Sequence, residues 1–504
     1  MGGDERQGVR CVPGTAGGDN VGHRRGEQEK VSAGTVLIPK KGISGDAVQT
    51  IYARATGQGV AAVAIYRISG PGAAAVLDAM TTRRRPAPRT AALRRFVDPE
   101  TGHTLDEGLA ILFPGPDSFT GEDVVEFQLH GGPAIEKDLY RCLSRLAARP
   151  AAPGEFTRRA LMNGRLDLAQ VEGLADLLVA ETSMQREQAL GQYGGKLSAR
   201  ADGWRRSLVE AMAQFEASID FADEADAPAT AAAARTPLTA LLTELRASAA
   251  GAVGAEAVRE GFRIAIIGAP NAGKSSLLNR LAGDERAIVS DVPGTTRDVI
   301  EARLDIGGRL VSVFDTAGLR TAASDAIELE GMRRSQAAAN KAHLRLILID
   351  PFADVSRGTS PVTSDGLVPR ETSALMRAGD LVVLTKTDLG AAAPGRVADP
   401  LVGEALRLSA KTGAGVDELI DEVARRLDEQ AGAFDEGALT RQRHIHAVET
   451  AIAAVERSLT RIDDAPELAA EDLRLAARYL GRIVGAVDVE DVLGEIFASF
   501  CIGK

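Results

Sequence analysis

The sequence predicts a multidomain protein of the α/β plus α class. Three patterns predict it: short strand candidates separated by Gly and Pro before residue 165, helical periodicity on both sides of the chain's middle, and an apolar run followed by a Gly-rich turn at residues 262–275. A chain of 504 residues has room for about three domains. We therefore expect an N-terminal α+β domain, a central helical domain formed by two chain segments, and an inserted domain with a mostly parallel sheet.

The composition is that of an ordinary globular protein, with 45% hydrophobic and 26% charged residues. No apolar run approaches the roughly 18 residues that span a membrane, and the start of the chain lacks a signal-peptide core, so the sequence predicts a cytoplasmic protein. Cys11, Cys142 and Cys501 lie far apart and support neither a disulfide framework nor a zinc site. The net charge of −11 argues against a surface that coats nucleic acid, so any RNA contact must be local or shared with a partner.

The first 165 residues fall into two parts of different character. Residues 1–45 are rich in Gly, polar and charged residues, which predicts a disordered tail. Residues 46–165 alternate short strands with turns, and in Val124–His130 every second side chain is apolar, which is typical of a strand with one buried face. The piece Arg83–Arg95 holds six arginines and no acidic residue, and it is either a solvated loop or an RNA-facing patch.

Helical periodicity begins at Leu166 and returns after residue 432. Apolar residues recur at spacings of three and four on one face in each block: Trp204, Leu208, Ala211, Phe215 and Ile219 in the first, and Ile445, Val448, Ile452, Val455 and Leu459 in the second. Each block is too small to bury both of its faces, so we expect segments 166–258 and 432–504 to pack on one another as one helical domain. The alternative is two independent helical domains.

Between the helical blocks, Gly268–Ser275 fits the pattern G-x-x-x-x-G-K-S, preceded by the strand candidate Phe262–Ile267. Glycines in such a loop let backbone N–H groups turn inward onto phosphate groups. Lys274 adds positive charge for the β- and γ-phosphates, and the Ser275 hydroxyl can hold Mg²⁺. The stretch therefore predicts a nucleotide-binding site.

Three further motifs indicate that the nucleotide carries guanine. Asp315-Thr316-Ala317-Gly318 follows an apolar strand and is typical of a switch that responds to the γ-phosphate. In Thr385-Lys386-Thr387-Asp388, the carboxylate of Asp388 can accept both N1–H and N2–H of guanine, a pairing that adenine cannot offer. Ser409-Ala410-Lys411 would supply a backbone donor to the guanine O6. We therefore expect residues 260–431 to form a GTP-binding domain.

The domain departs from the commonest GTPases at two positions. Thr385 stands where many GTPases have Asn, so the amide that would contact the base and brace the phosphate loop is lost. This substitution predicts a retained guanine preference with somewhat weaker affinity. Leu319 stands where a water-positioning Gln is often found, so another group must position the attacking water.

The stretches outside the GTP-binding domain resemble the MnmE (TrmE) family of tRNA modification GTPases. They run from about residue 46 to the end: Arg67-Ile68-Ser69-Gly70, Phe113–Glu126 with His130-Gly131-Gly132, Pro153-Gly154-Glu155-Phe156, Leu166–Gln170 and Phe500-Cys501-Ile502-Gly503-Lys504. The resemblance implies a GTPase that works with an FAD-dependent partner to install a carboxymethylaminomethyl or aminomethyl group at C5 of the wobble uridine of certain tRNAs. It also implies a tetrahydrofolate derivative of the 5-formyl or 5,10-methylene type as carbon donor, a homodimer, and a heterotetramer with the partner.

The same resemblance implies the roles of individual residues. It places a folate pocket in the N-terminal, dimer-forming domain 46–165, with Arg67, Glu126, Arg165 and Lys504 as contacts, although relatives usually carry Lys at the position of Arg165. The implied catalytic residues are Glu328, with Glu330 as the alternative, Thr295, and Cys501, which is either a nucleophile or a small buried apolar group. The implied metal ligands are Ser275 and Thr296 for Mg²⁺ and Asn271, Ser290, Val292 and Thr295 for K⁺.

The predicted nucleotide contacts come from the phosphate loop, the two switch stretches and the guanine motifs. They are Asn271, Ala272, Gly273, Lys274, Ser275, Ser276, Ser290, Asp291, Val292, Pro293, Gly294, Thr295, Thr296, Asp315, Thr316, Ala317, Gly318, Thr385, Lys386, Asp388, Ser409, Ala410 and Lys411. The alternative function is a GTPase switch that assists ribosome assembly without chemistry of its own. Such proteins usually carry a basic tail or an RNA-binding module, whereas this acidic chain ends in Cys-Ile-Gly-Lys.

Overall fold

The computed structural model describes residues 49–220, 234–269, 271–288, 301–315, 340–352, 376–390, 392–399, 403–486 and 503. The structural findings concern these residues. By its contacts the chain divides into Met1–Ser44 and Gly45–Lys504, and every described residue belongs to the second unit.

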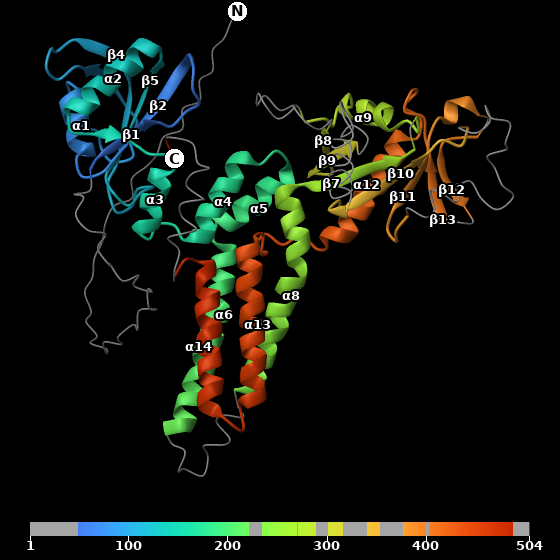
Figure 1. Ribbon diagram of the computed structural model, residues 1–504. Coiled ribbons are helices and arrows are strands. Elements are labelled where there is room, and N and C mark those ends of the chain that lie inside the picture. Colours follow the sequence, from blue (N-terminus) through green and yellow to red (C-terminus); the bar gives the residue numbers. More distant parts are fainter. Residues whose placement is uncertain are drawn as a thin grey trace, which may run out of the picture. The chain divides into compact units, whose positions relative to one another are not determined.

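The N-terminal part of the described chain is a six-stranded sheet in the order β3-β4-β5-β2-β1-β6 (Figure 1). Its strands are β1 (Ile51–Arg54), β2 (Ala61–Ser69), β3 (Ala92–Val97), β4 (Thr104–Phe113), β5 (Val124–Gly131) and β6 (Arg149–Pro150), and its helices are α1 (Ala73–Met80), α2 (Pro133–Arg145) and α3 (Glu155–Met162). The strand pairs are antiparallel except for β1 and β6.

Strand β5 shows how the sequence pattern becomes a two-sided sheet. Val125, Phe127 and Leu129 are buried, Glu126 is half-buried and His130 is exposed, as the alternation predicted. The apolar side chains join residues of α1 and α2 in one core, in which Phe96 and Phe127 meet edge to face. The opposite face of β5 is left free to carry polar side chains such as Glu126.

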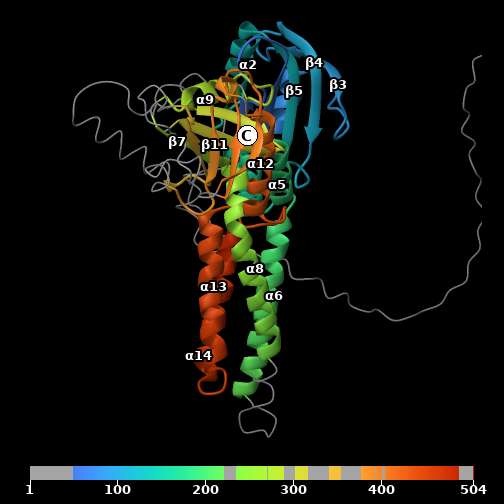
Figure 2. The same cartoon turned by 90° about the vertical axis from the view of Figure 1, so that its right-hand side faces the viewer.

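Within the described residues, the helical part of the protein consists of α4 (Leu168–Val179), α5 (Ser183–Tyr193), α6 (Lys196–Asp220), α8 (Arg235–Glu260), α13 (Gln442–Arg461) and α14 (Pro466–Ile483). Helices α6, α8, α13 and α14 run side by side (Figures 1 and 2). Their shared core includes Trp204 and Phe215 from the first block and Val448 and Val455 from the second. The two blocks thus bury one another's apolar faces. None of the described helices combines the length and the apolar composition needed to cross a bilayer.

Helix α4 begins where the sequence supplies a capping box. The Asp167 carboxylate accepts a hydrogen bond from the Gln170 backbone N–H at 2.9 Å, and the Gln170 side chain accepts one from the Asp167 N–H at 3.0 Å. This reciprocal pair satisfies two donors that a helix start would otherwise leave without a partner. The stretch Leu166–Gln170 therefore fixes the start of the helical part.

A second sheet of seven strands lies, in sequence, between the two helical blocks, in the order β12-β13-β11-β10-β7-β9-β8. The strands are β7 (Phe262–Gly268), β8 (Glu301–Ile306), β9 (Arg309–Asp315), β10 (Leu344–Ile349), β11 (Leu381–Leu384), β12 (Gly395–Asp399) and β13 (Gly403–Arg407), joined by α9 (Lys274–Ala282), the 3₁₀ turn η3 (Thr387–Leu389) and α12 (Val416–Ala431). The five central strands are parallel and only the edges β8 and β12 are antiparallel. Parallel strands end at the same edge of a sheet, so the segments after β7, β9 and β11 meet there.

The chain enters and leaves this sheet through two segments in direct contact. Helix α8 ends at Glu260. The next residue, Gly261, has a φ of 90° and turns the chain into β7. On the return, α12 ends at Ala431. A Cβ on Gly254 of α8 would lie 2.2 Å from the Ala431 carbonyl oxygen, so only glycine allows this approach.

Candidate functional site

The phosphate loop has the backbone that its sequence predicts. Asn271 and Gly273 have φ of 66° and 89°, values in the left-handed region, and α9 begins directly afterwards at Lys274. A Cβ on Gly268 would lie 2.5 Å from the Leu348 carbonyl oxygen of the neighbouring strand β10. The loop can therefore turn tightly between β7 and α9, and its N–H groups lie at the helix N-terminus, where anions are favoured.

Two side chains of this loop are placed for phosphate and metal chemistry. The buried Lys274 donates from Nζ to the carbonyl oxygens of Gly268 and Ala269 at 3.0 and 2.8 Å, so its charge lies over the loop. The Ser275 hydroxyl donates to Oδ2 of Asp315 at 3.0 Å, and Asp315, the last residue of β9, is only 1% exposed. Hydroxyl and carboxylate oxygens are the ligands that Mg²⁺ prefers, so the residues present fit that ion.

The residues predicted to read the base meet at the ends of β11 and β13. The Ser409 hydroxyl donates to Oδ1 of Asp388 at 2.6 Å, which leaves the other carboxylate oxygen exposed. This hydrogen bond, which favours the ionised form, lowers the pKa of Asp388 below its ordinary 3.8. Asp388 is therefore a fixed acceptor over the neutral range. Lys386 is held by an ion pair with Asp350, whose carboxylate lies 2.7 Å from its Nζ.

Thr385 differs from what the sequence predicted. The loss of an Asn amide at this position was expected to leave the phosphate loop without a brace. Instead the buried Thr385 hydroxyl donates to the Ala272 carbonyl oxygen at 2.8 Å and approaches the Ile349 carbonyl oxygen at 3.2 Å. A hydroxyl therefore supplies the brace, because β11 ends close enough to the loop for a short side chain to reach it.

Among the remaining predicted nucleotide contacts, Ser276 and Lys411 are exposed and Ala410 is half-buried. Many predicted residues lie outside the described part of the chain. These are Ser290, Asp291, Val292, Pro293, Gly294, Thr295, Thr296, Thr316, Ala317, Gly318, Glu328, Cys501 and Lys504. Of the predicted K⁺ ligands only Asn271 is described, and of the predicted Mg²⁺ ligands only Ser275.

Two of the predicted folate contacts are joined in the N-terminal sheet. Arg67 on β2 faces Glu126 on β5 in register, and its Nε and Nη2 donate to Oε1 of Glu126 at 3.0 and 2.8 Å. The Arg67 guanidinium also lies 5.4 Å from the Phe119 ring centre and 5.8 Å from that of Phe156. These rings provide an apolar and aromatic border beside the charged pair.

Arg165, the third predicted contact, lies beside the loop that contains Phe119. Its Nη1 is 3.6 Å from Oδ1 of Asp117, and its side chain is 41% exposed. A partner at this distance and exposure leaves the guanidinium accessible to an anionic ligand.

The end of the chain returns to the same sheet. Gly503 is buried, and a Cβ there would lie 2.1 Å from the Arg54 carbonyl oxygen at the end of β1. Arg54 is preceded by Ala53, which faces Arg67 in the register of β1 and β2. The last described residue therefore packs beside the strand pair that carries Arg67, one residue before Lys504.

Sequence reasoning missed a second ion pair in the N-terminal part of the protein, between Arg159 and Glu122. Arg159 of α3 donates to both carboxylate oxygens of Glu122 at 3.1 and 3.0 Å, and the buried Ser69 hydroxyl also donates to Glu122 at 2.7 Å. Ser69 lies within residues 67–70, one of the stretches that carry the family resemblance, so the sequence offered a reason to consider it. Arg159 carried no signal because its partner is far away in sequence.

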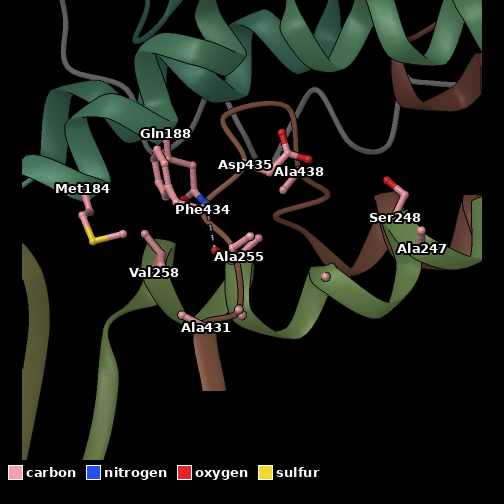
Figure 3. Close-up of a pocket in the computed structure, with 14 residues that line it drawn as sticks. Met184, Gln188, Ala247, Ser248, Ala255, Val258, Ala431, Phe434, Asp435 and Ala438 are labelled. Atoms are coloured by element: carbon pink, nitrogen blue, oxygen red, sulfur yellow. Dashed lines mark hydrogen bonds between the residues drawn. The ribbon is translucent and has the colours of Figure 1, made fainter. Parts of the chain in front are cut away.

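Two cavities lie elsewhere. One of about 280 Å³ is bordered by α5, α8 and residues 431–438, where Gln188 donates to the Ala255 carbonyl oxygen at 3.1 Å (Figure 3). The other, of about 340 Å³, lies beside Arg54, Glu136 and Tyr140. Neither is lined by Arg67 or by the phosphate loop, so neither belongs to the two sites above.

The comparisons with known proteins cover nearly the whole chain. Residues 50–165 match the family described as GTP-binding protein TrmE N-terminus, and residues 168–501 match the MnmE helical domain. The chain belongs to the MnmE family. A tRNA modification GTPase MnmE of Parvibaculum lavamentivorans is 51% identical over 462 residues, which cover 91% of this chain and 100% of that protein. The MnmE of Maricaulis maris is 48% identical over 459 residues, 90% of this chain and 99% of that protein.

Among solved structures, Aquifex aeolicus Era bound to GDP and AlF₄⁻ is 25% identical with a TM-score of 0.24, covering 38% of this chain and 66% of that chain. Membership of the MnmE family confirms the predicted resemblance and the multidomain α/β plus α class. The phosphate loop, the Arg67–Glu126 pair and the helical bundle are thus features of a member of the MnmE family.

Proposed function

We propose that this chain is a GTP-hydrolysing tRNA modification enzyme. With an FAD-dependent partner it adds a carboxymethylaminomethyl or aminomethyl group at C5 of the wobble uridine, using a tetrahydrofolate one-carbon donor. The observation that carries the proposal is the similarity, over almost the full length, to proteins named tRNA modification GTPase MnmE. The geometry of the phosphate loop and of the Arg67–Glu126 pair supports it.

For GTP binding, the proposal gives each described residue a task. Lys274 at the loop meets the β- and γ-phosphates, and the two carboxylate oxygens of Asp388 accept N1–H and N2–H of guanine, while the Ser409 hydroxyl donates to Oδ1 as well. Ser275, together with Thr296, would hold Mg²⁺, and Asp315 orients the Ser275 hydroxyl. Asn271, Ser290, Val292 and Thr295 would hold K⁺. When bound, these ions supply positive charge to the phosphates.

For hydrolysis, we propose Glu328 as the residue that activates the attacking water, with Thr295 as a second catalytic residue. Position 319 is a leucine, which has no group to position water. A separate carboxylate is therefore needed for that task.

For the one-carbon site, we propose that Arg67, Glu126, Arg165 and Lys504 bind the folate. A carboxylate such as Glu126 can accept hydrogen bonds from the amino and N–H edge of a pterin, and guanidinium groups pair with the carboxylates of a glutamate tail. The position of Gly503 beside β1 supports a place for Lys504 in this pocket. We propose Cys501 as a catalytic group at this site. We also propose that the protein is a homodimer and that it forms a heterotetramer with the FAD-dependent partner.

The experiment compares the wobble uridines of tRNA from cells that lack this protein with those from cells that carry variants. We expect unmodified C5 in the deletion strain, restoration by the native chain, and failure of Lys274→Ala and Glu126→Gln to restore. Purified Glu126→Gln should keep its GTP hydrolysis and lose folate binding, which separates the two sites. Normal wobble uridines with defective ribosomal subunits in the deletion strain would overturn the proposal in favour of an assembly GTPase.

A further inference from the structure

An arginine-rich segment joins α1 to the edge strand β3 of the N-terminal sheet. Between Ala79 and Val97 the chain has six arginines and no acidic residue: Arg83, Arg84, Arg85, Arg89, Arg94 and Arg95. We call these six residues the arginine patch. The whole chain has a net charge of −11, so such a concentration of positive charge is local to this surface.

Acidic side chains neutralise only part of the patch. Arg85 pairs with Asp78, and Arg95 pairs with Glu107 at 3.0 Å. Among the described residues, no acidic side chain lies within ion-pair distance of the other four arginines. Arg83, Arg84 and Arg89 are exposed, so these three positive charges face solvent without an internal counter-charge. Arg94 is half-buried, and its Nε is buried without a hydrogen-bond partner.

The arginines are nevertheless held in place. Arg94 donates from Nη1 to the Leu93 carbonyl oxygen at 2.9 Å and from Nη2 to the Arg84 carbonyl oxygen at 3.0 Å, which fixes its guanidinium beside the backbone of the connecting segment. Six positive charges within thirteen residues favour a ligand that carries several negative charges. Each of the two terminal nitrogens of Arg94 carries a second N–H, so these two donors are left for phosphate oxygens, whereas Nε is buried.

The patch also leads toward the candidate one-carbon site. Arg89 donates to the Asp117 backbone carbonyl and lies 5.8 Å from the Phe113 ring centre. The carboxylate of the same Asp117 is the partner of Arg165. One loop thus connects the patch with a predicted folate contact, so a long anion bound along the patch would extend to that site.

We propose that the arginine patch binds the sugar–phosphate backbone of the tRNA and orients the tRNA on the N-terminal sheet. This inference rests on the proposed function, which supplies the substrate. Phosphate contacts fix the position of a nucleic acid without reading its sequence, and arginine forks suit phosphate geometry. A nucleic acid fits better than a small phosphate compound, because the unneutralised charges are spread over a strand edge and a connecting segment rather than gathered in a cavity.

The test measures how fluorescently labelled, unmodified tRNA binds to the full chain at salt concentrations between about 50 and 200 mM. Binding is monitored by the fluorescence anisotropy of the labelled tRNA. The variant combines Arg83→Gln, Arg84→Gln and Arg89→Gln, all at exposed positions. Binding at the lowest salt should weaken at least about tenfold, and the slope of log K against log salt should fall by about one for each phosphate that the variant no longer binds. Basal GTP hydrolysis should not change, and thermal stability should fall only slightly, because Arg89 also donates to the Asp117 carbonyl oxygen.

The matched control removes three charges from exposed helical positions, with Arg186→Gln, Arg206→Gln and Arg478→Gln. It should bind tRNA like the native chain. Equal weakening in the control, or native affinity and salt slope in the patch variant, would overturn the inference. So would a patch variant that binds tRNA normally but loses self-association, because the patch would then be a protein interface.

The outcome for the patch can be told apart from that for the proposed function. Weak tRNA binding by the patch variant, together with normal wobble uridines in the deletion strain, would support the patch as a tRNA-binding surface and would contradict the proposed modification chemistry. Native tRNA binding by the patch variant, together with unmodified uridines in the deletion strain, would support the modification chemistry and would contradict the patch as a tRNA-binding surface.

Discussion

The hydroxyl of Thr385 donates a hydrogen bond of 2.8 Å to the carbonyl oxygen of Ala272 in the phosphate loop. This hydrogen bond joins the end of strand β11, which precedes the proposed guanine contact Asp388, to the loop that would hold the phosphates. We therefore expect the binding of the base and the order of the loop to be coupled through this buried side chain.

Replacing Thr385 by Val keeps the shape and removes the donor. We expect affinity for GTP to weaken about fivefold, because a buried hydrogen bond contributes about 1 kcal/mol. Thr385→Asn, which can donate to both loop and base, should tighten binding. A fluorescent GTP titration measures both, with the exposed Thr243→Val of α8 as control. Native affinity in Thr385→Val would show that the bond does not brace the loop.

Guanine preference should depend on Asp388. An amide in Asp388→Asn can accept from only one guanine N–H and presents its NH₂ to the other, so GTP affinity should fall by at least about tenfold, or about 1.4 kcal/mol. The amide can instead donate to the C2 oxygen of xanthine. Xanthosine triphosphate should therefore bind more tightly to Asp388→Asn than to the native chain. Competition of GTP, ATP and xanthosine triphosphate for one fluorescent nucleotide measures the change. Native binding of ATP as tight as that of GTP would contradict the assignment.

The helical part contains a buried ion pair between Glu172 of α4 and Arg443 of α13. Arg443 donates from Nε and Nη2 to the two carboxylate oxygens at 2.6 and 2.5 Å, while Nη1 donates to the Arg482 carbonyl oxygen at the end of α14. Burial acts to raise the pKa of Glu172, but hydrogen bonds from His444 and Arg443 outweigh it and hold that pKa at about 2. The pair therefore ties three helices together.

Arg443→Ala should leave the Glu172 charge buried without its main partner and destabilise the bundle by about 3–5 kcal/mol. The single tryptophan, Trp204, is buried in the bundle core, so its fluorescence during urea unfolding reports this part of the chain. The exposed pair of Arg246 and Glu456 provides the control, and Arg246→Ala should cost less than about 1 kcal/mol. Equal losses in the two variants would contradict a special role for the buried pair.

His444 gives the bundle a pH dependence. It is fully buried, and its Nε2 lies 3.0 Å from the Glu172 carboxylate, while Arg443 and Arg441 also face it. Burial lowers the pKa of His444 below 6.5, despite the opposing effect of Glu172. The unfolded chain thus takes up a proton that the folded bundle resists, so the stability contribution is complete above pH 6.5 and is lost as the pH falls through the lower folded pKa.

Unfolding followed by Trp204 fluorescence at pH 7.5, 6.5 and 5.5 measures this contribution. The free energy of unfolding should fall below pH 6.5 with a slope of at most about 1.4 kcal/mol per pH unit from this group. His444→Gln, which keeps a donor for Glu172, should flatten the curve. The exposed His446→Gln should not. An equally steep curve in His444→Gln would assign the effect to other groups.

Gly503 should be irreplaceable where it packs against β1. Its φ is 110°, and a Cβ would lie 2.1 Å from the Arg54 carbonyl oxygen, so Gly503→Ala cannot keep this contact. We expect hydrogen exchange in residues 52–56 to accelerate about tenfold, which corresponds to about 1.4 kcal/mol of local stability. Gly379→Ala is the control, since Gly379 has a φ of 92° but nothing near its Cβ position. Unchanged exchange in Gly503→Ala would contradict the contact.

Local pattern was enough to predict much of this protein. The alternation of β5, the faces of α6 and α13 and the strand–loop–helix order around Lys274 all depend on residues close together in sequence. Arg159 and the hydroxyl brace of Thr385 could not be predicted, because each depends on a partner more than thirty residues away.

The sequence by itself determined the kinds of element, the presence of a guanine-nucleotide loop and the family, since propensity, periodicity and motif spacing are properties of neighbouring residues. Only the tertiary structure decided which distant groups meet: Thr385 with Ala272, Glu172 with Arg443, and Gly503 with Arg54. The physical reason is that a hydrogen bond, an ion pair and a close backbone contact depend on distances of a few ångströms. The packing of sheets and helices sets those distances, and no local pattern encodes them.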